Sequence, residues 1–146
     1  MMSETGTNKP GPTLDQRRAS HAWRKIIAQA KVSSGQREYD EKAEEYAREA
    51  KKLPTRIMAA GLGQALAFIL AKAKDRKPNL KRLHEDLTDW VIKQRPMSAK
   101  KADSLMESII EGDSDFLRRA TDEVLAYLLW LNRFADAEGL TEGEEE

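Results

Sequence analysis

Apolar residues recur every three or four positions along almost the whole chain, which is the period of an amphipathic α-helix. The first such segment carries the series Leu14, Ala19, Ala22, Trp23, Ile26, Ile27 and Ala30. Ala, Leu, Glu, Lys and Arg, which all favour helices, dominate the sequence. The pattern therefore predicts an all-α fold.

Residues that start or stop helices divide the chain into about six segments. Thr13 followed by Gln16 has the spacing of a capping box, and Pro54 fits the first turn of a new helix. Gly61 and Gly63 are placed to bend or split their helix. We expect helices over residues 13–32, 36–53, 54–77, 79–95, 98–111 and 113–137, with caps at Asn79, Ser98 and Asp113 or Ser114. In the fifth helix, the residues expected to face inward are Ala102, Leu105, Met106, Ile109 and Ile110.

A chain of 146 residues is long enough for one domain and short for two. We expect a single-domain helical bundle over residues 13–138, with short connections. Residues 1–12 contain two prolines and almost no apolar side chain, which predicts a disordered N-terminal tail. Residues 139–146 are predicted to form an acidic C-terminal tail, which we expect to be disordered over residues 141–146.

The chain has no cysteine and only two histidines, which excludes disulfides, thiolate metal sites and a His-rich metal site. The longest near-continuous apolar run, Val124–Leu131, is far shorter than the roughly 20 residues that span a bilayer. No secretory signal is visible at the N-terminus. We therefore expect a cytoplasmic protein with no membrane partner.

The 25 basic and 25 acidic residues cancel, but they are separated along the chain. Residues 1–101 hold 22 basic and 12 acidic groups, whereas residues 102–146 hold 3 basic and 13 acidic groups. Cations gathered on one face would follow a phosphate backbone without reading sequence, and ordinary solvated helix faces are the alternative. Base stacking is not expected, because the aromatic residues sit mostly on apolar stripes. Oppositely charged halves also allow copies to associate head to tail in an open stack.

Two further patterns have both a functional and a structural interpretation. Gly61-Leu62-Gly63 lacks the third glycine and the preceding strand of a dinucleotide fingerprint, so we expect a role in helix bending or close packing. His21 and His84 are the only imidazoles and could serve as an acid–base pair. Both lie beside apolar stripes, which favours structural positions at the edge of the core.

Asp103, Glu107 and Glu111 recur every four residues and could together hold Mg²⁺ in a small metal-dependent nuclease. The row lies away from the apolar stripe of its helix, which favours a solvated face. We therefore expect no metal, no cofactor and no catalytic residue.

Three stretches, in their order and spacing, are similar to a known family. They are Leu14–Ala22; Leu53-Pro54 with Arg56 and then Gly61–Phe68; and Ala126–Ala135 around Trp130. Together they resemble the small α-helical subunit of the type III-B CRISPR effector, the Cmr complex, over about residues 13–138.

That resemblance implies a compact helical bundle with no catalytic activity of its own. Its copies would stack beside the backbone subunits that hold the guide RNA, with a basic face along the paired guide and target RNA. The implied partners are guide RNA, target RNA, other Cmr subunits (above all the backbone subunit) and further copies of the chain. Base pairing reads the sequence in a guide-directed complex, so the protein has to supply only nonspecific backbone contact.

We accordingly predict a non-enzymatic RNA-binding and assembly subunit of an RNA-guided antiviral complex. The predicted phosphate contacts are Arg17, Arg18, Lys25, Arg56, Lys72, Lys74, Lys81 and Arg82. The first four lie in or beside the family-like stretches, and the others come from charge clustering alone. The alternatives are a helical protein–protein scaffold without RNA contact and the metal-dependent nuclease.

Overall fold

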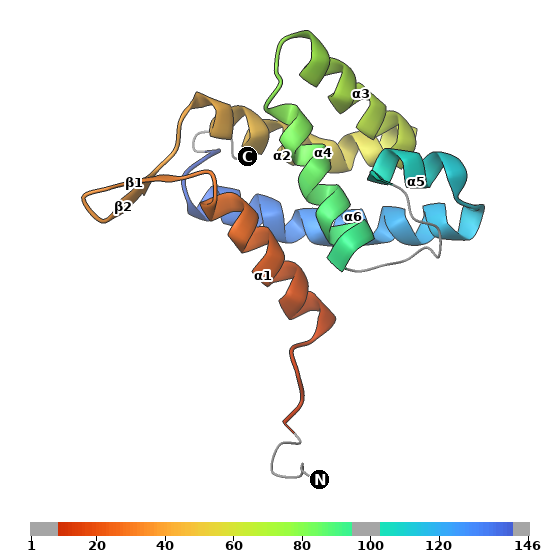
Figure 1. Cartoon of the computed structure of the whole chain (residues 1–146), viewed down its shortest axis with the longest axis horizontal. Helices are drawn as coiled ribbons and strands as arrows, with labels where there is room; N and C mark the ends of the chain where they lie inside the picture. Colours follow the sequence, from red (N-terminus) through yellow and green to blue (C-terminus); the bar gives the residue numbers. More distant parts are fainter. Residues whose placement is uncertain (1–8, 95–102, 142–146) are drawn as a thin grey trace.

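The structure, a computed structural model, describes residues 9–94 and 103–141 (Figure 1). Its six α-helices are α1 (Leu14–Ile27), α2 (Glu41–Ala60), α3 (Leu62–Asp75), α4 (Leu80–Thr88), α5 (Leu105–Glu111) and α6 (Ser114–Ala137). A π-helix, η2 (Asp89–Gln94), continues α4, and a hairpin of two short strands, β1 (Lys31–Ser33) and β2 (Gln36–Glu38), joins α1 to α2. The predicted all-α class and the predicted number of helices are confirmed.

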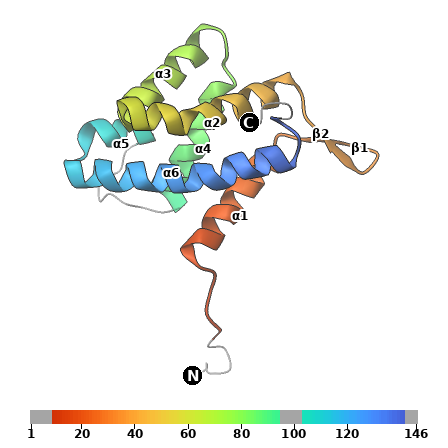
Figure 2. The ribbon, with the colours of Figure 1, turned by 180° about the vertical axis from the view of Figure 1, so that it is seen from behind.

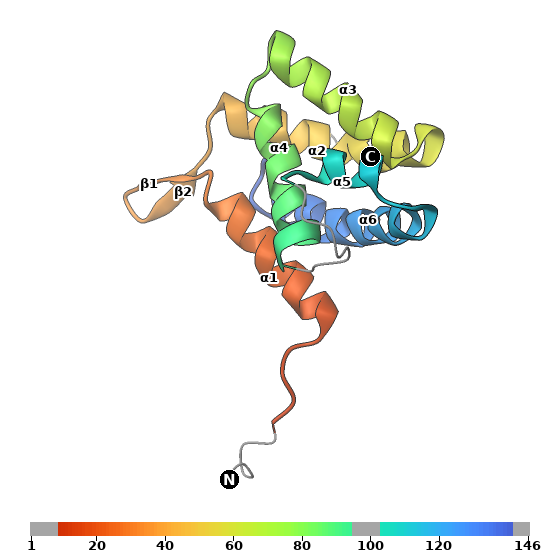
Figure 3. The ribbon, with the colours of Figure 1, turned by 45° about the vertical axis from the view of Figure 1, so that its right-hand side comes forward.

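The longest helix, α6, is the element on which much of the bundle packs. Both α1 and α2 lie against it, and α3 packs against α2 and α4. Seen from behind, α6 has α2 along one side and α1 on the other (Figure 2). The short helix α5 lies between α3 and α6 (Figure 3). At the centre of this arrangement, Tyr46, Leu66, Trp90 and Tyr127 are at most 2% exposed.

The caps predicted for the first and last helices are confirmed. Thr13 Oγ1 accepts the N–H of Gln16 at 3.0 Å, and Gln16 Oε1 accepts the N–H of Thr13 at 2.7 Å. Asp113 caps α6 by accepting the N–H of Phe116 at 2.8 Å. These signals are local in sequence, which is why they can be recognised without a structure.

Gly139 ends α6, as its place after the helix predicts. Its φ is 78°, and the N–H of Leu140 bonds to the carbonyl oxygen of Ala135 at 2.9 Å. This Schellman motif turns Leu140 onto the core, where it is 5% exposed. Of the two predicted tails, residues 1–8 and 142–146 lie outside the described residues, and residues 9–12 have no regular secondary structure. The tail predicted from residue 139 begins too early, because Leu140 and Thr141 are buried against the bundle.

The first predicted helix ends too late and the second, predicted from residue 36, begins too early, because residues 31–38 form a β-hairpin. α1 ends at Ile27, and Lys31 pairs with Glu38 in antiparallel register. Ser34 and Gly35 have φ values of 53° and 77°, the two positive angles that a type I′ turn requires. A serine–glycine pair between short segments is the signal that would have revealed it.

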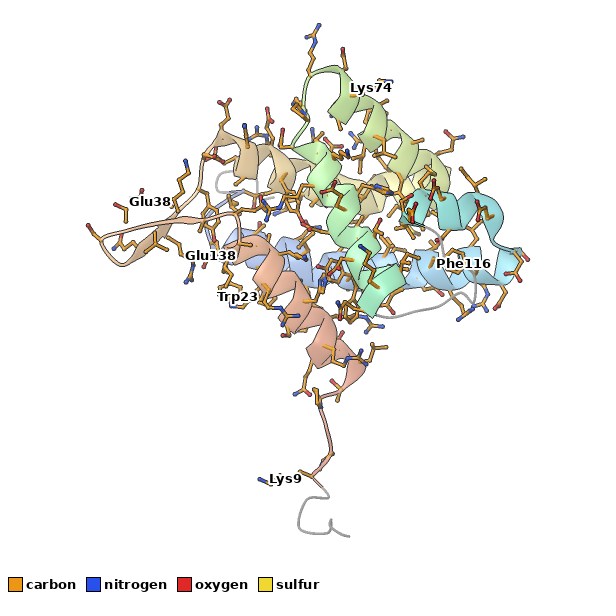
Figure 4. The ribbon with its side chains drawn as sticks, viewed as in Figure 1. Lys9, Trp23, Glu38, Lys74, Phe116 and Glu138 are labelled. Carbon is orange, nitrogen blue, oxygen red and sulfur yellow. The ribbon has the colours of Figure 1, made fainter. Side chains whose placement is uncertain are left out.

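Glu138 holds the hairpin to the end of α6. Arg37 Nε and the Tyr39 hydroxyl each donate to Oε1 of Glu138 at 2.7 Å. The Arg37 guanidinium also lies 5.2 Å from the ring centroid of Trp23, and Figure 4 shows Trp23 and Glu138 on this side of the bundle. Burial raises the pKa of Tyr39 to about 12, so its hydroxyl remains a donor at neutral pH.

The prediction that Pro54 begins a helix is wrong, because Pro54 lies inside α2. A proline has no N–H, so the carbonyl oxygen of Ala50 loses its usual helical partner. The side-chain Nδ2 of Asn132 donates to that oxygen at 3.0 Å. α2 ends instead at Ala60, and the next residue, Gly61, has a φ of 91°, so this glycine separates α2 from α3.

Two other predicted caps and one predicted core residue differ from the structure. Asn79 makes no cap bond, and its Nδ2 donates to the carbonyl oxygen of Lys42 at 2.9 Å. Ser104 caps α5, and the predicted cap Ser98 lies outside the described residues. Ile110 is 72% exposed, because α5 turns its other side toward the core. No described helix is long and apolar enough to cross a bilayer.

Candidate nucleic-acid interface

The eight predicted phosphate contacts lie on four helices and fall into two groups. Three of the eight, Arg17, Lys74 and Lys81, have no carboxylate of a described residue within 4.0 Å. Ion pairs within the chain engage the other five, namely Arg18, Lys25, Arg56, Lys72 and Arg82. The charge pattern of the sequence located the cations but not these partners.

Arg18 belongs to a buried network between α1, η2 and α6. Its Nε and Nη2 donate to the two carboxylate oxygens of Glu123 at 2.6 and 3.0 Å. Trp90 Nε1 donates to the same carboxylate at 2.8 Å. Because Glu123 is only 4% exposed, it needs such donors to carry its charge inside the bundle. Arg18 therefore stabilises the fold.

Lys25 and Arg82 both approach Asp86, at the outer limit of ion-pair distance. Lys25 Nζ lies 3.8 Å from Asp86 and 3.6 Å from Asp89, and Arg82 Nε lies 3.9 Å from Asp86. Burial raises the pKa of Asp86, whose Oδ2 accepts a 2.6 Å hydrogen bond from the Tyr46 hydroxyl. The side chains of Lys25 and Arg82 are 30% and 41% exposed, so both remain accessible to a ligand.

An open hollow of about 660 Å³ lies beside α4. Three cations, Lys25, Lys81 and Lys93, are in its lining. The lining also carries the acidic side chains of Glu85, Asp86, Asp89 and Asp103. This hollow is therefore mixed in charge and is not a uniformly basic groove.

Exposed cations are denser at the turn between α3 and α4. We call residues 74–81 the basic turn, and its cations are Lys74, Arg76, Lys77 and Lys81. Lys74 lies at the far end of α3 (Figure 4). Arg76 pairs with its neighbour Asp75 at 3.7 Å, and Lys77 lies 4.0 Å from Glu45. The Arg76 pair is exposed and therefore weak, and the half-buried Lys77 pair is at the limit of ion-pair distance, so the basic turn keeps most of its charge available.

Arg76 and Lys77 are absent from the predicted contacts, although the cationic run around them is visible in the sequence. The structure adds what the run alone does not show. The side chain of Arg76 is 86% exposed, and it stands on the same turn as Lys74. The basic turn is therefore a more compact cationic surface than the predicted set.

Arg56 and Lys72 share one buried carboxylate, that of Glu49, which is 3% exposed. Lys72 Nζ lies 2.9 Å from Oε1 of Glu49, and Arg56 binds Oε2. Burial pushes the pKa of Glu49 up, but hydrogen bonds from Lys72 and Arg56 outweigh it and hold the pKa below its usual value. The carboxylate is therefore charged, and it fixes both cations in place.

The same two cations lie over the ring of Phe68. Arg56 Cζ is 4.2 Å and Lys72 Nζ is 5.3 Å from the ring centroid. Phe68 is 45% exposed, whereas aromatic residues were expected on apolar stripes. The buried residues of α3 show why, because Leu62, Leu66 and Ile69 define a core face that does not include position 68.

The two histidines are buried in different networks and do not form an acid–base pair. His21 Nε2 lies 2.6 Å from Asp89 Oδ2, and His21 Nδ1 lies 2.6 Å from the Tyr127 hydroxyl. His84 Nε2 accepts the N–H of Met106 at 3.2 Å. Burial lowers the pKa of both imidazoles, so each joins neighbouring elements as a neutral group.

The carboxylates of Asp103, Glu107 and Glu111 are exposed and do not converge on a metal site. Glu107 Oε1 accepts the backbone N–H of Asp103 at 3.2 Å, which supports the start of α5. Within residues 9–94 and 103–141, no group of three or more His, Asp or Glu side chains is arranged to hold a metal ion. The nuclease alternative thus has no geometric support from these residues.

An apolar surface lies on the outer side of α6. Leu129 is 71% exposed, and two open hollows of about 380 and 270 Å³ adjoin it. We call this the Leu129 surface, and its residues are Pro54, Leu125, Ala126, Leu129, Trp130 and Arg133. Exposed apolar surfaces with a charged rim are typical of contacts with other proteins.

By its fold and surfaces, the chain is a small all-α domain with an exposed basic turn and an exposed apolar surface. The family model described as "CRISPR-associated protein (Cas_Cmr5)" matches residues 14–138. The chain belongs to the Cmr5 family, a family of structural subunits of the type III-B CRISPR complex, the Cmr complex. The resemblance found in the three sequence stretches is thereby confirmed.

Two relatives come from Thermus thermophilus. A protein named CRISPR system Cmr subunit Cmr5 is 38% identical over 93 residues, which are 64% of this chain and 74% of the relative. The crystal structure of a CRISPR-associated Cmr5 family protein superposes with a TM-score of 0.65 and 35% sequence identity. The superposition covers 86% of this chain and 97% of that chain, so most of the chain shares that fold.

Proposed function

We propose that the chain is a non-catalytic subunit that contacts RNA phosphates through the basic turn and neighbouring subunits through the Leu129 surface. The basic turn carries the proposal, because the exposed cations Lys74, Arg76 and Lys81 and the half-buried Lys77 stand together there, and only two long ion pairs, at 3.7 and 4.0 Å, engage them. Lysine and arginine at such a surface bind phosphates by releasing condensed counterions, and they do so without reading sequence. A complex whose guide RNA reads the target needs a contact of this kind.

The internal ion pairs divide the roles of the eight predicted contacts. Lys74 and Lys81 belong to the basic turn, and Arg17 presents a further exposed cation on α1. Lys25 and Arg82 are loosely held and can turn toward a phosphate. The remaining three, Arg18, Arg56 and Lys72, first neutralise buried carboxylates.

The salt dependence of RNA binding tests the basic turn. The test variant carries Lys74→Gln, Arg76→Gln and Lys81→Gln, and removing one cation that binds a phosphate should reduce the slope of log K against log salt by about 0.7. We expect the assembled complex with this variant to bind target RNA with a shallower slope, smaller in magnitude by about 2 for each copy that contacts the RNA. The matched control neutralises three other exposed cations, Lys31, Lys42 and Lys52, and should leave the slope unchanged. Equal slopes for both variants would refute the RNA contact.

Assembly tests the Leu129 surface. A Leu129→Glu variant places a charge in the apolar surface and should prevent incorporation into the Cmr complex, while the melting temperature of the purified chain changes little because the side chain is exposed. Ile110→Glu, at a side chain of equal exposure on α5, is the control. If Leu129→Glu blocks assembly while the triple variant of the basic turn leaves the salt slope unchanged, the chain is a protein scaffold without RNA contact.

A further inference from the structure

Phe68 is an aromatic ring on the outer side of α3, and its surroundings leave it accessible. Phe68 is 45% exposed even though Arg56 and Lys72 lie over its ring. Its exposed neighbours, Ala67 and Ala71, have small side chains that cannot cover it. Almost half of the surface of Phe68 therefore remains open to a ligand.

The charge around Phe68 is positive and fixed in position. Arg56 and Lys72 contribute two positive charges, and the buried carboxylate of Glu49 offsets one of them. Because Glu49 holds both cations on folding, little conformational entropy remains to be lost when a ligand binds. An exposed ring with a guanidinium and an ammonium over it is a surface for a ligand that combines a π system with negative charge.

We propose that Phe68, together with Arg56 and Lys72, is a stacking site for an unpaired nucleobase of single-stranded RNA. The base would stack on the exposed part of the ring, and its flanking phosphates would meet the two cations. Gln64, one turn before Phe68, is exposed and offers an amide to the edge of the base. A purely apolar protein partner fits less well, because it would bury both cations without a matching negative charge.

This site rests on the proposed RNA contact and extends it. Lys74 lies six residues beyond Phe68 on α3, a rise of about 9 Å along the helix. A strand anchored by a base at Phe68 can therefore continue to the basic turn. The chain would then combine one stacking contact with several phosphate contacts, a combination that is tolerant of sequence.

Binding of the full-length chain to single-stranded RNA tests the site. Fluorescence anisotropy is measured with a labelled eight-nucleotide RNA and with a blunt RNA duplex, each at several salt concentrations. Phe68→Leu keeps an apolar side chain but removes the π face, and it should weaken binding of the single strand by about five- to 150-fold. Phe68→Trp should bind at least as tightly as the unaltered chain, and the control Ile110→Ala should bind equally.

The salt slope separates stacking from phosphate contact. Phe68→Leu should leave the slope of the single strand and the affinity for the duplex unchanged, since a paired base is not free to stack. Lys72→Gln should instead reduce the slope by about 0.7. Unchanged affinity in Phe68→Leu, with reduced slopes in the lysine variants, would overturn the stacking site and leave the proposed RNA contact standing. Normal RNA binding by Phe68→Leu with failure to enter the complex would make the ring a protein contact and would also overturn it.

If the purified chain binds neither RNA up to its solubility limit, photocrosslinking in the assembled complex decides. Target RNA that carries 5-iodouridine outside the stretch complementary to the guide should give an adduct on Phe68 that disappears in Phe68→Leu. Adducts elsewhere on the chain but not on Phe68 would refute the stacking site alone. A complex that yields no RNA adduct on this chain would refute both the stacking site and the proposed function.

Discussion

The Nδ2 amide of Asn132 on α6 donates a 3.0 Å hydrogen bond to the backbone carbonyl of Ala50 on α2. That carbonyl would bond to the N–H of residue 54 in an uninterrupted helix, and residue 54 is a proline. A side chain on one helix thus supplies the donor that another helix lacks. The contact also fixes α2 against α6, next to the Leu129 surface.

A double-mutant cycle should show this dependence. Asn132→Ala leaves the Ala50 carbonyl without a donor and should lower the free energy of unfolding by about 1–3 kcal/mol. In a Pro54→Ala background, the new N–H at position 54 bonds to Ala50, so the same substitution should cost less, with a coupling of about 1 kcal/mol. Urea unfolding of the four proteins measures the cycle. Strictly additive costs would show that Asn132 does not replace the missing helical bond.

Gly61 and Gly63 should respond in opposite directions to substitution by alanine. Gly61 has a φ of 91° and a ψ of 159°, a region that is essentially restricted to glycine, so Gly61→Ala should lower the free energy of unfolding by about 1–3 kcal/mol. Gly63 lies within α3, and an added Cβ would meet Ile109 Cγ2 at 3.6 Å, an ordinary contact. Gly63→Ala should therefore stabilise the chain by about 0.4–1 kcal/mol.

Thermal unfolding of the two alanine variants provides the measurement. No atom lies within 4 Å of a Cβ built at Gly61, so steric crowding cannot cause the expected loss there. A Gly61→Asn variant serves as the control and should be as damaging as Gly61→Ala, because asparagine tolerates positive φ only in the left-handed helical region and the ψ of Gly61 is 159°. Equal effects at positions 61 and 63 would contradict the difference in their backbone conformations.

Local features of this fold could be predicted from the sequence, and features that depend on distant partners could not. The limits of α6 predicted from Asp113 and Gly139 are correct, because a helix cap and a helix stop act within a few residues. The prediction of a helix start at Pro54 is wrong because the side chain that replaces its missing N–H, Asn132, is 78 positions away in the sequence. The hairpin at residues 31–38 is the exception, since its turn signal is local.

The candidate site follows the same division. The positive charge of the basic turn is evident from the sequence, since its cations are consecutive or nearly so. The engagement of Arg18 by Glu123 is not, because 105 positions separate them and only the packing of α1 on α6 brings them together. A charge pattern therefore predicts where cations are, and the fold determines which of them remain available to a ligand.

Arg17 and Arg18 are adjacent in sequence but should differ sharply in their effect on stability. Arg18→Gln removes the arginine that pairs with the buried carboxylate of Glu123, and it should lower the free energy of unfolding by about 3 kcal/mol. This value is at the lower end for a buried ion pair because the Arg18 side chain is 17% exposed. Arg17→Gln should change stability by less than about 0.5 kcal/mol, since its side chain is exposed. Chemical unfolding of the two variants checks this. If Arg18→Gln were as stable as Arg17→Gln, then Glu123 would not depend on its arginine.

The pH dependence of stability should be governed by the two buried histidines between about pH 5.5 and 7.5. Burial lowers the pKa of His21 and of His84, so the unfolded chain binds protons that the folded chain does not. Stability is then fully present above about pH 6.5, the unfolded pKa, and falls as the pH drops below it. Each histidine contributes a slope of at most about 1.4 kcal/mol per pH unit.

His84→Gln isolates one of these contributions. The glutamine oxygen can replace His84 Nε2 as the acceptor for the N–H of Met106, so the packing of α4 against α5 is retained without a titrating group. We expect the loss of stability on acidification from pH 7.5 to 5.5 to be clearly smaller in this variant, with His21 supplying what remains. Asp86, whose pKa burial raises, acts in the opposite sense and is common to both proteins, so the comparison cancels it. Identical pH profiles for the two proteins would mean that the His84 imidazole titrates in the folded chain as it does in the unfolded one, and that its burial does not exclude the proton.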